Sequence, residues 1–214
     1  MKKRNNIIEA PLGETRVLLH TCCAPCSSAI IEAMMKNGIT PVIYYCNPNI
    51  YPLEEYEVRK NECTRYAEAL GLEIVDADYD HDNWLLLMKG LEDEPERGGR
   101  CLKCFKLRLL RTARYARDHG FRVITTTLAS SRWKSLDQIN EAGFWACNQV
   151  ADRHLSTETP VPVDKTNDGP VWWPYNWKKG GLQERRLQII REYGFYNQLY
   201  CGCEFSMRVM ASKE

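Results

Sequence analysis

Cysteine is the residue type in this sequence whose number and spacing point most directly to chemistry. Three of the ten cysteines stand in the stretch Cys22-Cys23-Ala24-Pro25-Cys26, and two more form the pair Cys101-x-x-Cys104. Two-residue spacings of this kind suit a shared metal centre, and zinc and iron–sulfur clusters both accept four thiolates. The sequence therefore predicts a metal site with five candidate ligands: Cys22, Cys23, Cys26, Cys101 and Cys104.

The pair Cys201-Gly202-Cys203 has a closer spacing. With one residue between them, the two thiols form a disulfide only under strain, and strained disulfides are typically labile or catalytic. The same spacing is awkward for two ligands of one tetrahedral metal ion. We predict that Cys201 and Cys203 are catalytic, as a dithiol that shuttles electrons; metal ligation and a structural role are the alternatives.

The composition narrows the class of protein. Hydrophobic residues make up 44% and charged residues 27% of the chain, as in a folded domain with a packed core. No apolar run approaches the roughly 20 residues of a membrane helix, and no long apolar segment follows the basic start, so we expect a cytoplasmic protein with no membrane partner. The net charge of +1 predicts no global attraction to nucleic acid, so any such site must be a local patch.

Apolar runs and helical periodicities alternate along the chain. Strands are predicted at 16–20, 41–46, 72–75 and 123–128, with a possible edge strand at 159–164; helices are predicted at 27–37, 53–70, 83–91, 101–118, 136–150 and 183–193. This order predicts an α/β fold with a mainly parallel sheet flanked by helices, in a single domain over residues 1–214. Cys63 and Cys147 lie on apolar faces of these helices and are predicted to be structural.

The predicted elements bring the first cysteines to the edge of the sheet where open α/β folds bind ligands. The stretch 22–26 follows the first strand and opens the first helix, where free N–H groups and the helix dipole favour thiolate over thiol. The loop at 47–52 follows the second strand, and the segment 129–134 follows the fourth. All three segments are therefore expected at one edge.

Three further segments allow two interpretations each. The aromatic segment 172–177 precedes Lys178 and Lys179, which suits base stacking beside phosphates or a loop packed over the sheet edge. The acidic segment 76–82 is a solvated loop or holds one metal ligand, for which Asp80 is the candidate. The basic face of the helix at 101–118 is solvated or binds a polyanion.

Five blocks of sequence, in order between about residues 16 and 207, carry a family resemblance. They are His20-Thr21-Cys22-Cys23-Ala24-Pro25-Cys26; Tyr45-Cys46-Asn47-Pro48-Asn49-Ile50-Tyr51-Pro52; Glu94-Pro95-Glu96 with Arg100-Cys101-x-x-Cys104-Phe105; Thr126-Thr127-Leu128 with Ser130-Ser131-x-x-Lys134; and Tyr200-Cys201-Gly202-Cys203-Glu204-Phe205-Ser206. With these blocks the chain resembles the cobalamin-independent epoxyqueuosine reductases, the QueH family.

The resemblance implies a reaction, two cofactors and a fold. The epoxide of epoxyqueuosine, at the wobble position of certain transfer RNAs, would lose its oxygen to give queuosine. The implied cofactors are a [4Fe–4S] cluster and an adjacent mononuclear iron, and the implied partners are the tRNA and an electron donor of unidentified kind. The implied fold is nucleotide-hydrolase-like (HUP) and PP-loop-related, with the cysteine turn where those proteins hold phosphate.

Roles for individual residues follow from this resemblance. Cys22, Cys101 and Cys104 are the first choices as cluster ligands. Cys23 and Cys26 are candidates for a fourth ligand or for the second iron, with Asp80 as an oxygen ligand. The expected substrate contacts are Asn47, Asn49, Tyr51, Ser130, Lys134, Trp177 and Lys178.

Two other functions remain open from the residues alone. A thiol–disulfide oxidoreductase would use Cys23 and Cys26, but it leaves Cys101 and Cys104 idle. A zinc-stapled RNA-binding module without catalysis would account for the cysteines together with the basic and aromatic segments. Iron and sulfide in the purified protein would separate the reductase from both.

Overall fold

A five-stranded parallel sheet forms the centre of the computed structural model, which describes residues 7–151 and 169–211. The strand order is β3-β2-β1-β4-β5, and each neighbouring pair is parallel. The strands are β1 (Arg16–Thr21), β2 (Thr40–Tyr45), β3 (Ile74–Asp76), β4 (Val123–Thr126) and β5 (Val171–Trp172). The predicted parallel α/β sheet is confirmed, and because all strands run the same way, their carboxyl ends share one edge.

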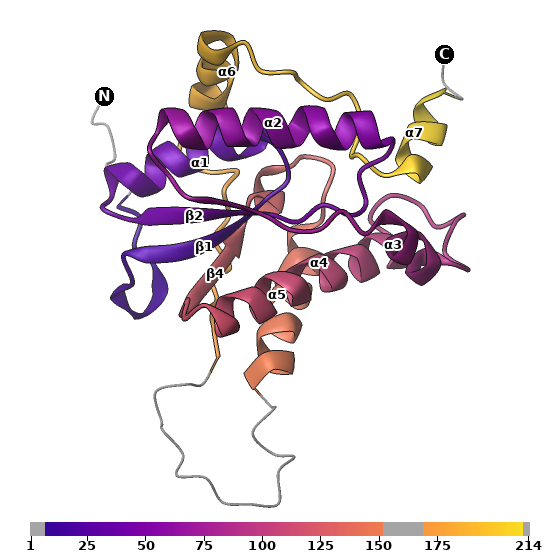
Figure 1. The fold of residues 1–214 in the computed structure, drawn as a ribbon, viewed down its shortest axis with the longest axis horizontal. Coiled ribbons are helices and arrows are strands. Elements are labelled where there is room, and N and C mark those ends of the chain that lie inside the picture. The colour runs from indigo at the N-terminus through magenta and orange to yellow at the C-terminus, as the bar shows by residue number, and fades with distance from the viewer. Residues whose placement is uncertain (1–6, 152–168, 212–214) are drawn as a thin grey trace, which may run out of the picture.

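Helices cover both faces of the sheet (Figure 1). One face carries α1 (Ala24–Lys36), α2 (Leu53–Ala69) and α6 (Leu182–Tyr193), and the other carries α4 (Gly99–Asp118) and α5 (Leu136–Ala151). Beyond the carboxyl ends of the strands lie α3 (His81–Met88) and α7 (Glu204–Ala211). Short 3₁₀ turns occur at η1 (Pro11–Gly13) and η2 (Thr127–Ser130).

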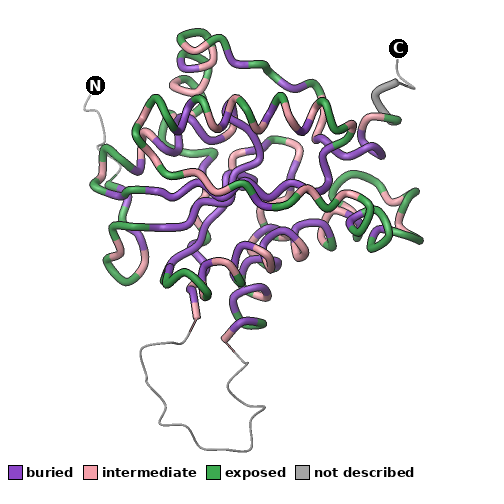
Figure 2. Tube along the Cα trace, viewed as in Figure 1, coloured by how far each residue is buried: buried purple, intermediate pink, exposed green. Residues whose placement is uncertain are grey.

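The core lies in two layers, one on each side of the central strands (Figure 2). Val17, Leu18 and Leu19 of β1 have no exposed surface, because a central parallel strand is covered on both faces. Each such side chain contributes roughly 1.5–3 kcal/mol by leaving water. A third, smaller cluster joins α3, the start of α4 and α7 through Trp84, Cys104 and Phe205.

Helix α1 begins three residues earlier than the sequence predicts. Cys23 occupies its N-cap position and Pro25 fits its first turn, where a missing N–H costs nothing. Cys26 therefore lies inside the helix rather than before it. Strand β4 ends at Thr126 instead of 128, because the Thr126 hydroxyl accepts the Leu128 N–H and starts η2. The predicted edge strand at 159–164 lies outside the described residues, and α7 is an additional helix.

The aromatic segment packs over the sheet edge. Trp172 and Trp173 are each 5% exposed, and Trp177 is fully buried against Trp173 and Tyr175. The expectation that Trp177 stacks on a base is therefore wrong, because both faces of its ring are covered. Gly143 makes room for this segment: a Cβ there would lie 2.2 Å from the Trp172 ring. None of the described helices is both long and apolar enough to cross a membrane.

Candidate metal centre

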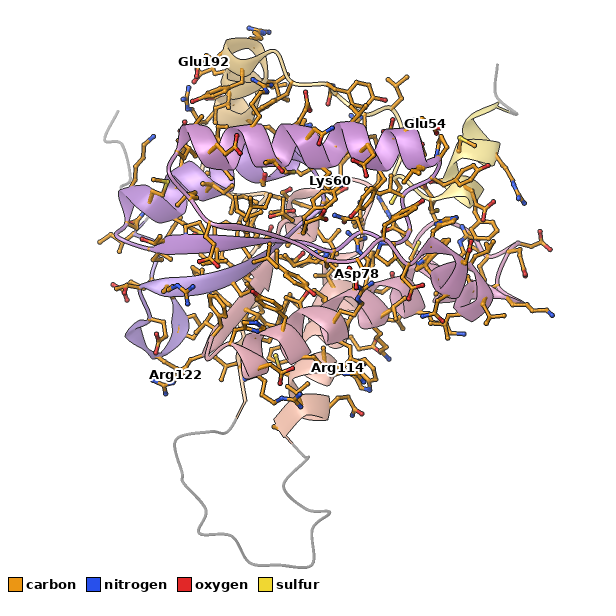
Figure 3. All side chains as sticks on the ribbon, viewed as in Figure 1. Glu54, Lys60, Asp78, Arg114, Arg122 and Glu192 are labelled. Carbon is orange, nitrogen blue, oxygen red and sulfur yellow. The ribbon has the colours of Figure 1, made fainter. Side chains whose placement is uncertain are left out.

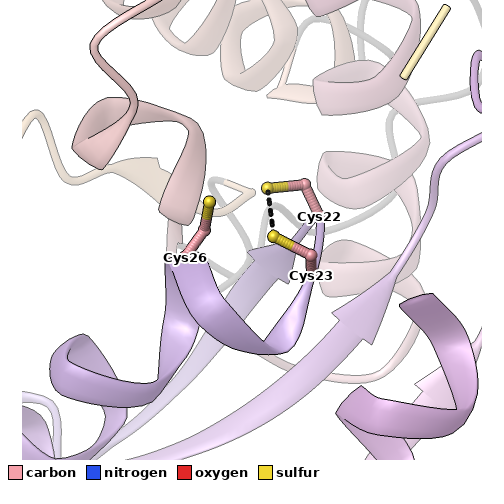
Figure 4. Close-up of side chains that lie close together, drawn as sticks. All are labelled: Cys22, Cys23 and Cys26. Carbon is pink, nitrogen blue, oxygen red and sulfur yellow. Dashed lines mark hydrogen bonds between the residues drawn. The ribbon is translucent and has the colours of Figure 1, made fainter. Parts of the chain in front are cut away.

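Three thiols converge at the carboxyl end of β1. Cys22 and Cys23 follow the strand, Cys26 lies in the first turn of α1, and the three Sγ atoms lie within 4.8 Å of one another (Figure 4). The Cys22 and Cys23 sulfurs are 3.8 Å apart. The turn is held by η2, the 3₁₀ turn that follows β4, because the Cys22 N–H donates to the Thr127 hydroxyl at 3.3 Å. The three cysteines could supply three sulfur ligands to one metal centre.

The pKa values of the three thiols are shifted in opposite directions. Hydrogen bonds from Cys23 and Cys26 lower the pKa of Cys22 well below its usual value, and Lys134 and Arg108 add to this effect. Burial raises the pKa of Cys23 well above its usual value, and the hydrogen bond to Cys22 raises the pKa of Cys26 to about 11. Metal ligation by all three would release the protons of Cys23 and Cys26.

Four other cysteines line a second, smaller site. A cavity of about 20 Å³ is bounded by Cys101 and Cys104 of α4 and by Cys201 and Cys203, which precede α7. Asn49 Oδ1 and Trp84 Nε1, on residues that also line it, are buried without a hydrogen-bond partner. Unpaired buried polar atoms beside thiols suit a bound group that the thiols hold. The cysteines thus lie in two groups, 22/23/26 and 101/104/201/203, and the grouping of Cys22 with Cys101 and Cys104 as ligands of one cluster stays a prediction.

Two buried cations connect the groups. Arg108 is 2% exposed and Lys134 is 8% exposed, and neither pairs with a carboxylate among the described residues. Burial by itself lowers the pKa of Lys134, but electrostatic interaction with the neighbouring cysteine side chains outweighs it and raises the pKa. The charge of Arg108 acts on both Cys22 and Cys104. Buried charges require partners, and thiolates are the partners that this site offers.

His20 lies next to the cysteine turn but is no free ligand. Its Nε2 faces the Cys46 carbonyl oxygen at 3.1 Å, and its Nδ1 faces the Thr126 hydroxyl at 2.7 Å. Because a carbonyl can only accept, Nε2 carries the proton and Nδ1 accepts from Thr126. Burial, helped by the charge of Arg108, lowers the pKa of His20 to about 3. The imidazole is therefore neutral and holds β1 and β4 together.

Comparison with known proteins identifies the family. The family model described as "Epoxyqueuosine reductase QueH" matches residues 17–209. The chain belongs to the QueH family. A relative of that name from Histophilus somni is 45% identical over 201 residues, covering 94% of this chain and 76% of the relative. Another from Acinetobacter baylyi is 41% identical over 208 residues, covering 97% and 88%.

More distant proteins are also similar. The QueH relative from Thermotoga maritima is 30% identical over 194 residues and covers 89% of this chain and 90% of its own. Among solved structures, the U34-tRNA thiolase NcsA from Methanococcus maripaludis with its [4Fe-4S] cluster matches with a TM-score of 0.46 and 12% identity, over 98% of this chain and 67% of that chain.

The residues expected to contact substrate in this QueH chain occupy different environments. Ser130 and Lys178 line a large cavity beside Cys26, and Asn49 lines the small one. Asn47 is 1% exposed, and its amide donates to the Thr21 carbonyl and accepts from Arg108. In the structure Asn47 therefore joins the end of β1 to the middle of α4, and its amide already has a protein partner on each side.

Tyr51, Lys134 and Asp80 complete the expected set. The backbone of Tyr51 binds Gly202 and Tyr200, and its ring, 38% exposed, stacks on His81. Lys134 is buried beside the thiols as described above. Asp80 is exposed, and its carboxylate accepts a hydrogen bond from Asn83 at 3.0 Å. This places Asp80 outside both cysteine groups, and we leave it out of the proposed ligand set.

Sequence reasoning missed three residues that organise the thiols of this QueH chain. Arg108 is the buried cation described above. Gln198 donates from Nε2 to Cys23 Sγ at 3.0 Å and to Cys26 Sγ at 3.5 Å. Arg59, 2% exposed and paired with Glu55 at 2.6 Å, donates to the carbonyls of Tyr200 and Cys201. The helical spacing of Cys104 and Arg108 was the one available signal, since positions four apart share a face.

The Gly202→Ala substitution is expected to destabilise the segment that carries Cys201 and Cys203. Gly202 has a φ of +117°, and a Cβ there would lie 2.9 Å from Arg59 Nη1 and 3.2 Å from Ile50 Cγ1. Backbone strain and overpacking together cost about 1–3 kcal/mol. The measurement is the free energy of unfolding in urea. Gly120→Ala is the matched control, because Gly120 has a φ of +72° but a Cβ there would have no atom within 4 Å. Equal losses in the two variants would contradict the close packing on Arg59.

Proposed function

We propose that this chain catalyses the two-electron deoxygenation of the epoxide of epoxyqueuosine in tRNA, which leaves the cyclopentene of queuosine. The observation that carries the proposal is the convergence of Cys22, Cys23 and Cys26 within 4.8 Å at the ligand edge of the sheet, in a chain of the QueH family. The proposed cofactors are a [4Fe–4S] cluster and an adjacent iron. The proposed partners are the tRNA and a separate electron donor.

The residues present fit iron bound by thiolates. Cys22 already favours the thiolate, and the buried charges of Arg108 and Lys134 offset the negative charge that further thiolates would bring. Trp84 Nε1 is a buried donor without a partner beside Cys104, and hydrogen bonds to sulfur are one means by which proteins tune iron–sulfur centres. We propose that Cys22, Cys23, Cys26, Cys101 and Cys104 hold the two cofactors.

The chemistry divides between the cofactors and the chain. When bound, the cluster and the iron supply single electrons and a Lewis acid for the epoxide oxygen. Lys134, a buried cation beside Cys22 and Cys26, stabilises negative charge that develops on that oxygen and can hand it a proton. Its burial at 8% exposure strengthens this interaction, because little water competes for the ammonium group.

Cys201 and Cys203 are the source of both electrons in this proposal, and the cluster would pass them on one at a time. An epoxide becomes an alkene and water by taking up two electrons and two protons. Oxidation of the two thiols to one disulfide releases two electrons and two protons, so the balance closes, and the external donor then restores the dithiol. Both thiols line the small cavity with Cys101 and Cys104, which places the dithiol next to the proposed metal ligands.

The geometry disfavours the thiol–disulfide oxidoreductase. That function needs an accessible, low-pKa thiol to attack a substrate disulfide. Cys23 is 1% exposed, and burial raises its pKa. Cys26 is more exposed, but the hydrogen bond to Cys22 raises its pKa to about 11. The two thiols of that motif are therefore poor nucleophiles in this structure.

The function is tested with anaerobically purified protein, a chemical reductant and tRNA that carries epoxyqueuosine. We expect nucleoside digests analysed by mass spectrometry to show queuosine, which has lost one oxygen atom. The Cys147→Ala variant is the control for loss of a thiol alone, because Cys147 is a buried thiol of α5 outside both groups. Recovery of unchanged epoxyqueuosine with metal-replete protein would contradict the proposal.

A further inference from the structure

A cavity of about 620 Å³ opens beside Cys26. Most of its walls come from the segment after η2 with Arg132 and Trp133, from helix α6 with Arg186, and from the segment that contains Gln198. Lys178 also lines it. The volume lies in the range of about 300–1,000 Å³ that is typical of small-molecule sites, so the cavity suits one nucleotide rather than a duplex.

The charged side chains that line the cavity are all positive. Three cationic side chains border the cavity, namely Arg132, Lys178 and Arg186, and no aspartate or glutamate does among the described residues. Arg186 is fixed in place, because its guanidinium donates to the Pro25 carbonyl at 2.8 Å and to Asn197 at 3.3 Å. This local field favours an anionic ligand, although the net charge of the chain is only +1.

The cavity also offers an aromatic platform. Trp133 is half-buried, and the Arg132 guanidinium lies 4.9 Å from the centre of its ring. Arg97 holds this segment through hydrogen bonds to the carbonyls of Arg132 at 2.7 Å and Trp133 at 3.2 Å. A ring held beside cations is the combination by which proteins bind single-stranded nucleic acid, with bases stacked and phosphates paired.

Gln198 connects the cavity to the thiols. It lines the cavity and is 7% exposed, and its Nε2 donates to Cys23 at 3.0 Å. Its Oε1 is buried and has no hydrogen-bond partner. A buried carboxamide oxygen normally accepts a hydrogen bond. A ligand bound in the cavity can supply the donor that the protein does not. Gln198 is thus placed between the ligand and Cys23.

We infer that this cavity receives the extruded wobble nucleotide, with Trp133 as the stacking platform and with Arg132, Lys178 and Arg186 on the flanking phosphates. Gln198 is a positioning residue that accepts a hydrogen bond from the nucleoside and holds it against the thiols. An enzyme that reacts on a base in folded RNA must take the base out of its stack. Cys26, a proposed metal ligand, lies at the cavity wall, so a nucleotide bound in the cavity would lie beside the reaction site. The inference rests on the proposed function for the identity of the nucleotide.

The test is RNA binding by fluorescence anisotropy at several salt concentrations, with an anticodon stem–loop that carries guanosine at the wobble position. We expect Trp133→Ala to weaken binding at least about fivefold and Trp133→Phe to restore most of it. The Arg132→Gln, Lys178→Gln double variant should lower the slope of log K against log salt by about 0.7 for each phosphate that no longer has a cationic partner. Iron content should stay at the wild-type value, since none of these residues is a proposed ligand.

A matched control removes two arginines elsewhere. Arg114 and Arg122 are exposed and lie in the layer of α4 and at the start of β4, on the side away from α6 (Figure 3). The Arg114→Gln, Arg122→Gln variant should bind like wild type. Equal affinities and salt slopes in the cavity and control variants, with wild-type turnover of epoxyqueuosine tRNA, would overturn the inference and leave the proposed function intact.

The opposite pattern separates the two proposals. If the cavity variants lose binding as expected but wild-type protein forms no queuosine, the cavity binds RNA and the proposed function fails. The Gln198→Met variant tests the positioning role, because methionine has a similar volume but no amide. We expect a lower kcat with little change in RNA affinity, and an unchanged kcat would remove Gln198 from the inference.

Discussion

Cys22→Ala is expected to abolish both iron binding and turnover. Cys22 is the thiol of the 22/23/26 group that favours the thiolate, so its loss removes the sulfur best prepared to bind a metal. It also removes a thiolate that interacts electrostatically with the buried side chains of Lys134 and Arg108. Turnover should fall to the level without enzyme, and iron and sulfide analysis of the purified variant should show the loss.

Cys147→Ala provides the comparison for this variant. Cys147 is 6% exposed in α5, and burial raises its pKa to about 12, so it is a thiol of the core. Its replacement should cost stability through a small cavity and leave the iron and sulfide content unchanged. A Cys22→Ala protein with full iron, full sulfide and visible absorbance would show that the convergence of the three thiols has no part in metal binding.

The double variant Cys201→Ser, Cys203→Ser is expected to retain the cluster and lose multiple turnover. Serine cannot form a disulfide and is a poor ligand for iron held by thiolates, so the dithiol loses its redox function. Iron and sulfide analysis together with a turnover assay separates the possible roles. If the pair holds the second iron, the variant should lose about one iron and no sulfide.

A structural role for the pair predicts a third pattern. Iron content, sulfide content and turnover would then all stay at the wild-type values. Only the stability measured by urea unfolding would fall. Single-turnover assays with a pre-reduced cluster add a further distinction: full activity of the double serine variant would show that neither thiol takes part in the chemical step. Loss of activity with intact iron and sulfide supports the electron relay.

Local pattern was enough to predict most of the fold. The run 17–19 and the helical face with Phe105, Leu109 and Ala113 are buried as expected, because the period of apolar residues reflects which face meets the core. Asn37 and Gly38 end α1 as predicted, since Gly38 takes a φ of +75°. Cys63 and Cys147 are buried as structural thiols.

Contacts between residues far apart in the sequence could not be predicted from the local pattern of apolar and polar residues. Arg108 is followed by several similar basic residues on α4, and only its packing against Cys46 and Asn47 distinguishes it. The burial of Trp172 depends on Gly143, 29 residues earlier in the chain, which leaves space for the ring. No spacing within the aromatic segment itself carries that information.

The grouping of the thiols was equally hidden. The spacing of Cys101 and Cys104 predicts that they act together, but not which cysteines join them. Arg59 and the start of α7 bring Cys201 and Cys203 to the small cavity. The pairing of two segments about 100 residues apart rests on a buried arginine, and no motif signals it.

Whether these thiols hold an iron–sulfur centre is decided by iron and sulfide analysis of anaerobically purified protein. We expect iron together with acid-labile sulfide, with iron in excess by about one atom per chain for the adjacent iron. Zinc without sulfide would point instead to the zinc-stapled RNA-binding module, and a metal-free protein with a reversible Cys23–Cys26 disulfide would point to the oxidoreductase. Either result would contradict the claim that these thiols hold an iron–sulfur centre.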